Sequence, residues 1–508
     1  MLTNLPMRFN SISIKALYFI GHWKKMTLLL FAVTSIAWFL ADIEVIAIDP
    51  WLEFSRMGQG FLHPDFFATE YLLEALWQTI SFALLGIVTG LILGCPLALI
   101  YQHPLVAALC AFIRAIHEIF WALIFLQLFG LSAITGILAI GLPYAATFAR
   151  VFSDILQQAP THTLFSLTKG TDKLSGFIYG RWMHVYPQLL DYIRYRFECA
   201  LRSSAVLGFI GMPTLGFYLE SAFRQGHYQQ GSALLILFIL LIGSIRFWAK
   251  PFLLWLYLPI ALYFLPPIPT INGQLIWRFF SVDILPPMLQ RQTFINWFDI
   301  ETLSKLVSWI YKLTTQQVLP GIIATLILAF CALGLTYLLT LILLPFNTKL
   351  MMPKAITFLM RAINLILRSL PEYLLAFVFM MLLGPSMLPA IIALALHNSG
   401  LLVFLMARKI DNTIVPLTYQ PRIDHYSYLV IPANYPHFMG LLFYRFEVII
   451  RETAILGMIG VMTLGFYVDS NFSEIRFSGA LLLLIFTASL NIIVDYLARR
   501  LLITSHVL

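Results

Sequence analysis

One segment occurs twice in this chain, as YRFECALRSSAVLGFIGMPTLGFY at residues 195–218 and as YRFEVIIRETAILGMIGVMTLGFY at residues 444–467. Fifteen of the 24 positions are identical, and the two copies align without a gap at a constant offset of 249 residues. An internal repeat of this kind predicts that a structural unit has been duplicated. We therefore expect two homologous halves, residues 1–250 and residues 251–508.

The repeat extends beyond this segment. Three residues of the first half match three of the second at the same offset, and three more form a weaker match. The matched sets are Tyr179, Tyr186 and Pro187 with Tyr428, Tyr435 and Pro436, and Arg114, Glu118 and Gly130 with Arg368, Glu372 and Gly384.

The composition indicates that these halves lie in lipid. Of the 508 residues, 60% are hydrophobic and 11% are charged, whereas a soluble domain carries about 25% charged residues. Apolar runs near 20 residues recur along the chain, and about 20 helical residues cross a hydrocarbon core. These runs must be helices, because a bilayer holds no water to satisfy the free edge of a strand. We expect an all-α polytopic membrane protein.

About 12 transmembrane helices are expected, six in each half. They lie near 26–41, 74–101, 105–130, 131–153, 190–211 and 232–249, and near 251–267, 319–346, 355–384, 387–407, 438–460 and 478–497. The first apolar run also resembles a secretory signal. However, Ala41-Asp42-Ile43-Glu44 is a poor cleavage site, which favours a retained span.

Charges beside the first span set the expected orientation. Lys24 and Lys25 precede it, and Asp42 and Glu44 follow it, so the preference for basic residues inside places the N-terminus in the cytoplasm. Alternation of the spans from there also places the C-terminus, with Arg499 and Arg500, in the cytoplasm. The two repeats then run in the same direction, which predicts parallel halves with a path between them. The net charge of +8 includes no dense basic run, so nucleic acid is not an expected partner.

The repeated segment carries charged residues inside an expected span. Glu198 precedes Arg202 by four residues, and Glu447 precedes Arg451 by four, which places each pair on one helix face. A charge at the bilayer centre costs about 2.5–3.5 kcal/mol on insertion scales, so these side chains should face protein or a cavity. They are interpreted either as ion pairs that fasten each helix or as arginines that attract an anionic substrate.

Glycines follow each charged pair at identical spacing. Glycine permits close helix approach or an irregular backbone. Close packing is the more frequent role of glycine in membrane helices. The identical spacing in both halves adds weight to the alternative interpretation, in which these glycines shape a constriction. They are Gly208, Gly211 and Gly216 in the first half, and Gly457, Gly460 and Gly465 in the second.

Two long polar loops, 158–187 and 411–436, are moderately basic and end in proline. A passive connector between adjacent helices is usually shorter than these loops, which are about 25–30 residues long. We therefore expect each loop to be a docking surface for a cytoplasmic partner.

Several catalytic and cofactor motifs are absent from the sequence. No Gly-Lys dipeptide occurs, so the phosphate-binding loop of ATPases is missing. There is no H-E-x-x-H motif, the histidines are scattered, and the four cysteines form no C-x-x-C pair. Neither a metal, nor a cofactor, nor an enzyme active site is expected.

The pattern YRFExxxRxxxxLGxxG, preceded by Tyr-Pro after a cytoplasmic loop, resembles the phosphonate-type permease of ABC importers, here as two fused units. The resemblance runs from Arg114 to near Phe223 and from Arg368 to near Phe472. It implies a binding-protein-dependent permease of the bacterial cytoplasmic (inner) membrane. The partners that it implies are two cytoplasmic ATP-binding subunits and an external or periplasmic substrate-binding protein. The implied substrate is a phosphonate or a related phosphorus oxyanion.

The loops depart from the coupling motif of that family, which is Glu-Ala-Ala followed by a glycine. The first half keeps the glycine but lacks the acid, and the second half has a tyrosine where the glycine should stand. The two coupling loops are therefore expected to be unequal. The residues that match or replace this pattern, including the closing prolines, are Gly170, Thr171, Pro187, Tyr419, Pro432 and Pro436.

Three alternatives remain open from the sequence. A secondary transporter also uses repeats and charges near the bilayer midplane, but it would leave the long loops without a purpose. A membrane-embedded enzyme would need a nucleophile–base or metal constellation, and none is evident. An importer of another small polar solute is the third.

Overall fold

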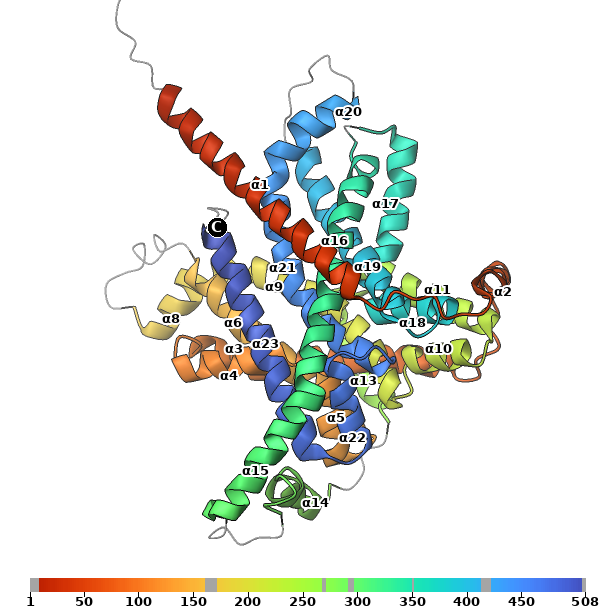
Figure 1. The fold of residues 1–508 in the computed structure, drawn as a ribbon, viewed down its shortest axis with the longest axis vertical. Helices are drawn as coiled ribbons and strands as arrows, with labels where there is room; N and C mark the ends of the chain where they lie inside the picture. Colours follow the sequence, from red (N-terminus) through yellow and green to blue (C-terminus); the bar gives the residue numbers. More distant parts are fainter. Residues whose placement is uncertain are drawn as a thin grey trace, which may run out of the picture. The chain divides into compact units, whose positions relative to one another are not determined.

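The computed structural model describes residues 9–159, 171–266, 271–290, 297–349, 351–412 and 422–504. Within these ranges the regular structure is helical, without a strand (Figure 1). Several helices are long and apolar enough to cross a membrane. The expected all-α polytopic architecture is confirmed.

The chain folds into two compact units, and each draws on both halves of the sequence. Unit 1 consists of Met1–Ala47, Leu319–Phe466 and Ile493–Leu508, and unit 2 consists of Ile48–Val318 and Tyr467–Ile492. These units describe packing, whereas the expected division at residue 250 describes the duplication. That division stays a prediction.

Unit 2 is built around the long contact between two helices, α3 and α6, against which α9 also packs. Gly86, Gly90 and Gly94 form a stripe along α3 that lies against α6, and a Cβ at Gly94 would lie 2.7 Å from the carbonyl oxygen of Ala145. The small residues therefore let the two backbones approach closely. The helices of unit 2 are α2 (Pro50–Leu62), α3 (Leu72–Leu99), α4 (Pro104–Ala115), α5 (Glu118–Phe129), α6 (Ala133–Gln157), α8 (Lys173–Phe177), α9 (Met183–Val206), α10 (Leu215–Arg224), α11 (Tyr228–Gly243), α12 (Ile245–Trp248), α13 (Leu254–Tyr263), α14 (Gly273–Arg278) and α15 (Ile300–Leu313).

Unit 1 repeats this plan with α16 and α19 at its centre and α21 packed against both. Its helices are α1 (Phe9–Leu40), α16 (Leu319–Asn347), α17 (Lys354–Ser369), α18 (Glu372–Leu383), α19 (Met387–Asn412), α20 (Arg422–His425) and α21 (Ile431–Met458). The last two helices, α22 (Leu464–Ser473) and α23 (Phe477–Thr504), contribute residues to both units.

Each half contains one sharply broken helix pair. The angle is 93° between α4 and α5 and 94° between α17 and α18. Pro371 lies at the second break, where it lacks an N–H group to continue the helix. At the first break, the ring of His117 accepts a hydrogen bond from the backbone N–H of Ile119 and caps α5. A single apolar run in the sequence is thus two helices in the structure.

The described residues contain six helices that are long and apolar enough to cross a membrane, or up to nine spans if each of three bent pairs is one span. The sequence led us to expect about 12. The expected spans at 232–249 and 251–267 correspond to the shorter helices α11 and α13. The span expected at 438–460 lies in α21, which is long but carries four charged residues, Arg445, Glu447, Arg451 and Glu452.

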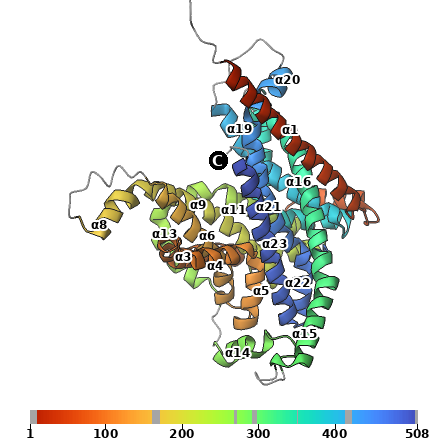
Figure 2. The same cartoon turned by 60° about the vertical axis from the view of Figure 1, so that its left-hand side comes forward.

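The first helix of each half packs within the unit that is built mainly from the other half. Helix α1 lies along α16 in unit 1 (Figure 2), where a Cβ at Gly334 would lie 2.1 Å from Thr34 Cγ2. Helix α13, which follows residue 250, packs on α3 in unit 2. There Phe264 stacks on Trp77 with ring centroids 5.7 Å apart. The two halves thus exchange their leading helices.

Candidate functional site

The repeated glycines form the same close turn in both halves. In unit 2, a Cβ at Gly216 would lie 1.9 Å from the carbonyl oxygen of Ala205, and a Cβ at Gly208 would lie 2.2 Å from the amide nitrogen of Phe217. Gly211, between them, has a φ of +92°, in the left-handed region that favours glycine. The backbone can therefore fold α10 back against the end of α9, with a bend of 52°.

The copy in unit 1 matches this geometry closely. A Cβ at Gly465 would lie 1.9 Å from the carbonyl oxygen of Ala454, and one at Gly457 would lie 2.1 Å from the amide nitrogen of Phe466. Gly460 has a φ of +105°. These contacts fix the turn by backbone packing, and a role of the glycines in a constriction stays a prediction.

A threonine from the central helix anchors each turn. Thr79 Oγ1 of α3 accepts a hydrogen bond of 2.9 Å from the backbone N–H of Leu215. Thr325 Oγ1 of α16 accepts the equivalent bond of 3.1 Å from Leu464. All four residues are buried. The short helices α10 and α22 are therefore held to the core at their first residue.

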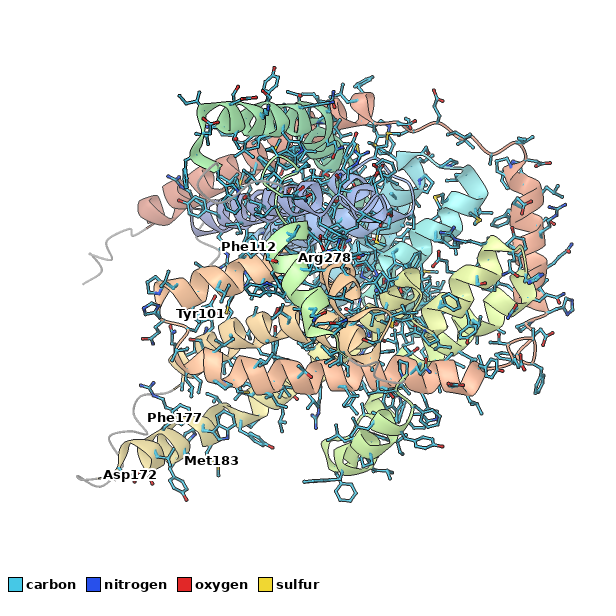
Figure 3. The ribbon with its side chains drawn as sticks, turned by 90° about the horizontal axis from the view of Figure 1, so that it is seen from below. Tyr101, Phe112, Asp172, Phe177, Met183 and Arg278 are labelled. Atoms are coloured by element: carbon cyan, nitrogen blue, oxygen red, sulfur yellow. The ribbon has the colours of Figure 1, made fainter. Side chains whose placement is uncertain are left out.

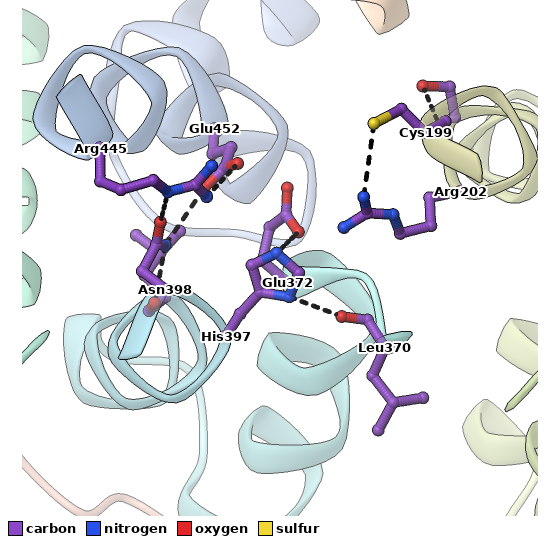
Figure 4. A network of polar contacts seen from close by, with 10 residues as sticks. Cys199, Arg202, Leu370, Glu372, His397, Asn398, Arg445 and Glu452 are labelled. Atoms are coloured by element: carbon purple, nitrogen blue, oxygen red, sulfur yellow. Dashed lines mark hydrogen bonds and ion pairs between the residues drawn. The ribbon is translucent and has the colours of Figure 1, made fainter. Parts of the chain in front are cut away.

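The expected ion pairs within α9 and α21 are not formed in this structure. Among the residues that the structure describes, neither Glu198 nor Glu447 takes part in an ion pair. Arg202 instead directs Nη2 toward Cys199 Sγ, 3.5 Å away (Figure 4). Arg451 interacts electrostatically with its neighbour Glu452. A role of these arginines in the substrate path stays a prediction.

A buried polar cluster in unit 1 was not found from the sequence. It joins α18, α19 and α21 through Glu372, His397, Asn398, Arg445 and Glu452 (Figure 4). Arg445 Nη2 lies 3.4 Å from Glu452 Oε1, and its Nε donates to Asn398 Oδ1. Asn398 Nδ2 lies 3.4 Å from Glu452 Oε2. Arg445 thus has an ion-pair partner and a hydrogen-bond acceptor inside its own unit.

Unit 2 has an arginine at the position equivalent to Arg445, but the residues around it differ. Arg196 takes the place of Arg445, and Ser203 takes the place of Glu452, both at the offset of 249. Tyr144 OH lies 3.5 Å from Ser203 Oγ, whereas Asn398 bonds to Glu452 in unit 1. Both halves therefore have an arginine at this position of the repeat, but only the second half has a glutamate, Glu452, at the partner position.

The expected coupling loops, 158–187 and 411–436, lie partly outside the described residues. Gly170 and Tyr419 are among the residues outside, and Thr171 is exposed next to α8. The Asp172 carboxylate caps α8 by accepting a hydrogen bond of 3.1 Å from the backbone N–H of Ser175. Hydrogen bonds from the side chain and backbone of Ser175 lower the pKa of Asp172.

The segment after this cap leads into α9 and presents aromatic side chains to solvent. Asp172, Phe177 and Met183 follow one another along α8 and into α9 (Figure 3). The exposed fraction is 63% for Tyr179 and 76% for its repeat partner Tyr428.

The prolines that close the two loops lie within helices. Pro187 lies inside α9 and Pro436 inside α21, and Pro432 lies in the first turn of α21.

No protein-family model matches the chain, and no solved structure matches it. Curated relatives do match. The phosphate-import permease protein PhnE of Mycolicibacterium smegmatis is 24% identical over 445 residues, which cover 80% of this chain and 81% of that protein. The phosphite transport system permease protein PtxC of Stutzerimonas stutzeri is 23% identical over 239 residues, which cover 44% of this chain and 86% of that protein.

A third relative is the putative cryptic phosphonate transport system permease protein PhnE2 of Escherichia coli. It is 37% identical over 78 residues, which cover 15% of this chain and 64% of that protein. The Stutzerimonas protein aligns along most of its length with less than half of this chain, as expected if this chain holds two such units. The resemblance to phosphonate-type permeases is confirmed.

Proposed function

We propose that this chain is the membrane permease of an ATP-driven importer, and that its substrate is a phosphorus oxyanion such as phosphate, phosphite or a phosphonate. The observation that carries this proposal is the alignment along 80% of the chain with a phosphate-import permease. Two further relatives are named for phosphite and phosphonate transport. The shared chemistry of these three solutes is a small tetrahedral anion.

The interior of the helical units suits such a substrate. Arg196, Arg202 and Arg451 lie on helices in which charge is costly unless it faces a partner or a cavity. The guanidinium group offers several N–H donors in a planar fork that matches the oxygen atoms of a phosphoryl group. A path lined by arginines therefore favours an oxyanion over a neutral solute.

The permease is further proposed to depend on separate subunits for energy and for substrate capture. Two cytoplasmic ATP-binding subunits would dock on the loops 158–187 and 411–436, where the exposed Tyr179 and Tyr428 offer apolar contact area. An external or periplasmic binding protein would deliver the anion. The chain itself would hydrolyse no ATP and hold no cofactor, and both termini would lie in the cytoplasm of the bacterium.

A transport assay tests this proposal. The chain is expressed together with its ATP-binding subunit and binding protein in a bacterium that lacks other uptake systems for phosphate and phosphite. Labelled anion should accumulate, and accumulation should stop when the ATP-binding lysine of the ATPase subunit is replaced. Uptake that survives this replacement but collapses with a protonophore would identify a secondary transporter instead.

A further inference from the structure

We propose that Arg196 of the first half binds the transported oxyanion and that its repeat partner Arg445 does not. The identity of the anion rests on the proposed function, whereas the site itself rests on the geometry around α9 and α21. The two arginines occupy the same position of the repeat, so the difference lies in their neighbours.

Arg196 lies among three tyrosine rings. Its Cζ atom is 5.7 Å from the ring centroid of Tyr144, 5.2 Å from that of Tyr192 and 5.6 Å from that of Tyr195. At these distances the negative faces of the rings stabilise the guanidinium charge. The rings hold the cation in place without neutralising it, because each tyrosine is neutral.

Most hydrogen-bond donors of Arg196 have no acceptor in the part of the chain that the structure describes. A guanidinium group has five N–H donors, and Nε donates to Tyr192 OH at 2.8 Å. Among the residues that the structure describes, no other hydrogen bond and no ion pair involves Arg196. Arg196 is half-buried. The four N–H groups of Nη1 and Nη2 therefore remain available to a ligand.

Arg445 is satisfied from within its own unit. Asn398 accepts from Nε, and the Glu452 carboxylate lies 3.4 Å from Nη2. Glu452 is itself buried, with an exposed fraction of 7%. An anion that approached Arg445 would compete with a carboxylate that is already desolvated and in place. At the equivalent of Glu452, the first half has the uncharged Ser203.

A small oxyanion supplies what Arg196 lacks. Two of its oxygen atoms can accept bidentate hydrogen bonds from the guanidinium edge, which are shorter and stronger than neutral ones. Its negative charge would balance a cation that the aromatic neighbours leave unbalanced. Cys199 and Arg202 follow at three-residue intervals along α9. The next arginine is therefore about 9 Å further along the helix, at 1.5 Å of rise per residue.

Anion-dependent thermal protection of the purified full-length chain tests the site directly. Inorganic phosphate, phosphite and sulfate are titrated, with chloride as the reference at equal ionic strength. The wild-type chain should be protected by the tetrahedral oxyanions. Arg196→Gln should weaken the apparent affinity about tenfold or more, as loss of a charged hydrogen-bond donor predicts. The double variant Arg445→Gln/Glu452→Gln should keep the affinity within about twofold, because it removes a pair that balances itself.

A second comparison uses the other half as a template, and it decides the case if Arg196→Gln fails to fold. Ser203→Glu copies Glu452 and should neutralise Arg196 from within, so oxyanion protection should be lost. Ser203→Gln is similar in size but uncharged and should retain it. Retention in both variants, or equal loss in both, overturns the proposal, because charge at this position then plays no part.

The remaining outcomes separate the site from the proposed function. If oxyanions protect the Arg196→Gln variant as well as they protect the wild-type chain, the assignment to Arg196 is overturned. Loss of protection in the double variant alone overturns it too. A wild-type chain that no oxyanion protects does the same, while the transport assay still judges the proposed function. If sulfate protects the chain but the chain imports no phosphorus oxyanion, the anion site at Arg196 is supported and the proposed substrate is wrong.

Discussion

His397 of α19 bonds through Nδ1 to the carbonyl oxygen of Leu370, 2.8 Å away, at the break between α17 and α18. A carbonyl oxygen only accepts, so Nδ1 carries the hydrogen atom. The opposite ring nitrogen, Nε2, lies 3.5 Å from Glu372 Oε2. In unit 2 the equivalent Glu118 meets a histidine from its own break, His117, at 3.4 Å. Both breaks therefore hold a glutamate–histidine pair, although the histidines come from different helices.

Replacement of His397 should destabilise unit 1. His397→Leu would leave the Leu370 carbonyl oxygen without its donor in the buried core, at a cost of about 1–3 kcal/mol. The apparent melting temperature of the purified chain should fall. His103→Gln, at an exposed position, is the control and should leave the melting temperature unchanged. An unchanged value for His397→Leu would show that the break is held by other contacts.

The glycine turns should tolerate no side chain. Gly216→Ala and Gly465→Ala each place a methyl group 1.9 Å from a backbone oxygen, so each should cost about 1–3 kcal/mol or more through overpacking. Gly243→Ala is the matched control, because nothing lies within 4 Å of its added Cβ. Yields and melting temperatures of the three variants provide the measurement. Equal stability of all three would mean that the turn can open at little cost.

Arg202 and Arg451, one in each copy of the repeated segment, should matter for transport more than for folding. Arg202→Gln and Arg451→Gln should each lower the uptake rate about tenfold or more through loss of charged donors, with membrane insertion and ATPase assembly intact. Uptake and assembly are measured on the same membranes. If both variants, together with Glu198→Gln, lose the folded protein, these residues are structural supports. Normal uptake would exclude both roles.

The exposed tyrosines of the coupling loops should affect energy coupling. Tyr179→Ala and Tyr428→Ala should reduce stimulation of the ATP-binding subunit, because each removes a large apolar contact. We expect the first-half variant to be the more harmful, since that loop keeps Gly170. Tyr311→Ala, with an exposed fraction of 70% in α15, is the control. Stimulation that is unaffected in both loop variants would argue against docking at these loops.

The orientation of the chain can be tested with reporter fusions. A fusion after the C-terminus should report the cytoplasm, and a fusion within residues 270–315 should report the outside. The reason is that basic residues beside the first span favour the cytoplasmic side. Enzymatic reporters that are active on one side of the membrane give the measurement. Two fusions on the same side would require a different number of spans between them.

The part of the site that repeats could be predicted from the sequence. Gly208 and Gly457 were identified because identical spacing in two halves is visible in the letters, and the structure places them in matching turns. Glu452 could not be found in this way. Its repeat partner is Ser203, and a comparison that looks for identical residues does not single out a position where the two halves differ. His397 aligns with no histidine in the other half. Its role depends on a contact with Leu370 that no local pattern reveals.

The helix boundaries and partners were harder to predict for physical reasons. The first break gives no sequence signal, since Ile116 and His117 contain neither proline nor glycine, and the apolar run continues through it. Periodicity indicates which face of a helix is buried but not which helix covers it. The contact of α1 with α16 is therefore tertiary information that the sequence pattern does not contain.

The exchange of leading helices has a consequence for how the protein is made. Leu40 ends α1 and Leu319 begins α16, so the ribosome must add about 280 residues before the first helix can meet its partner. At roughly 5–20 residues per second, that interval is about 15–55 s. During this time the face of α1 that will contact Gly334 must be sheltered by lipid, by the insertion machinery or by a transient neighbour. Unit 1, which contains the chain's first helix, is therefore completed late in synthesis. A long translational pause or a truncated message would leave α1 without its partner helix.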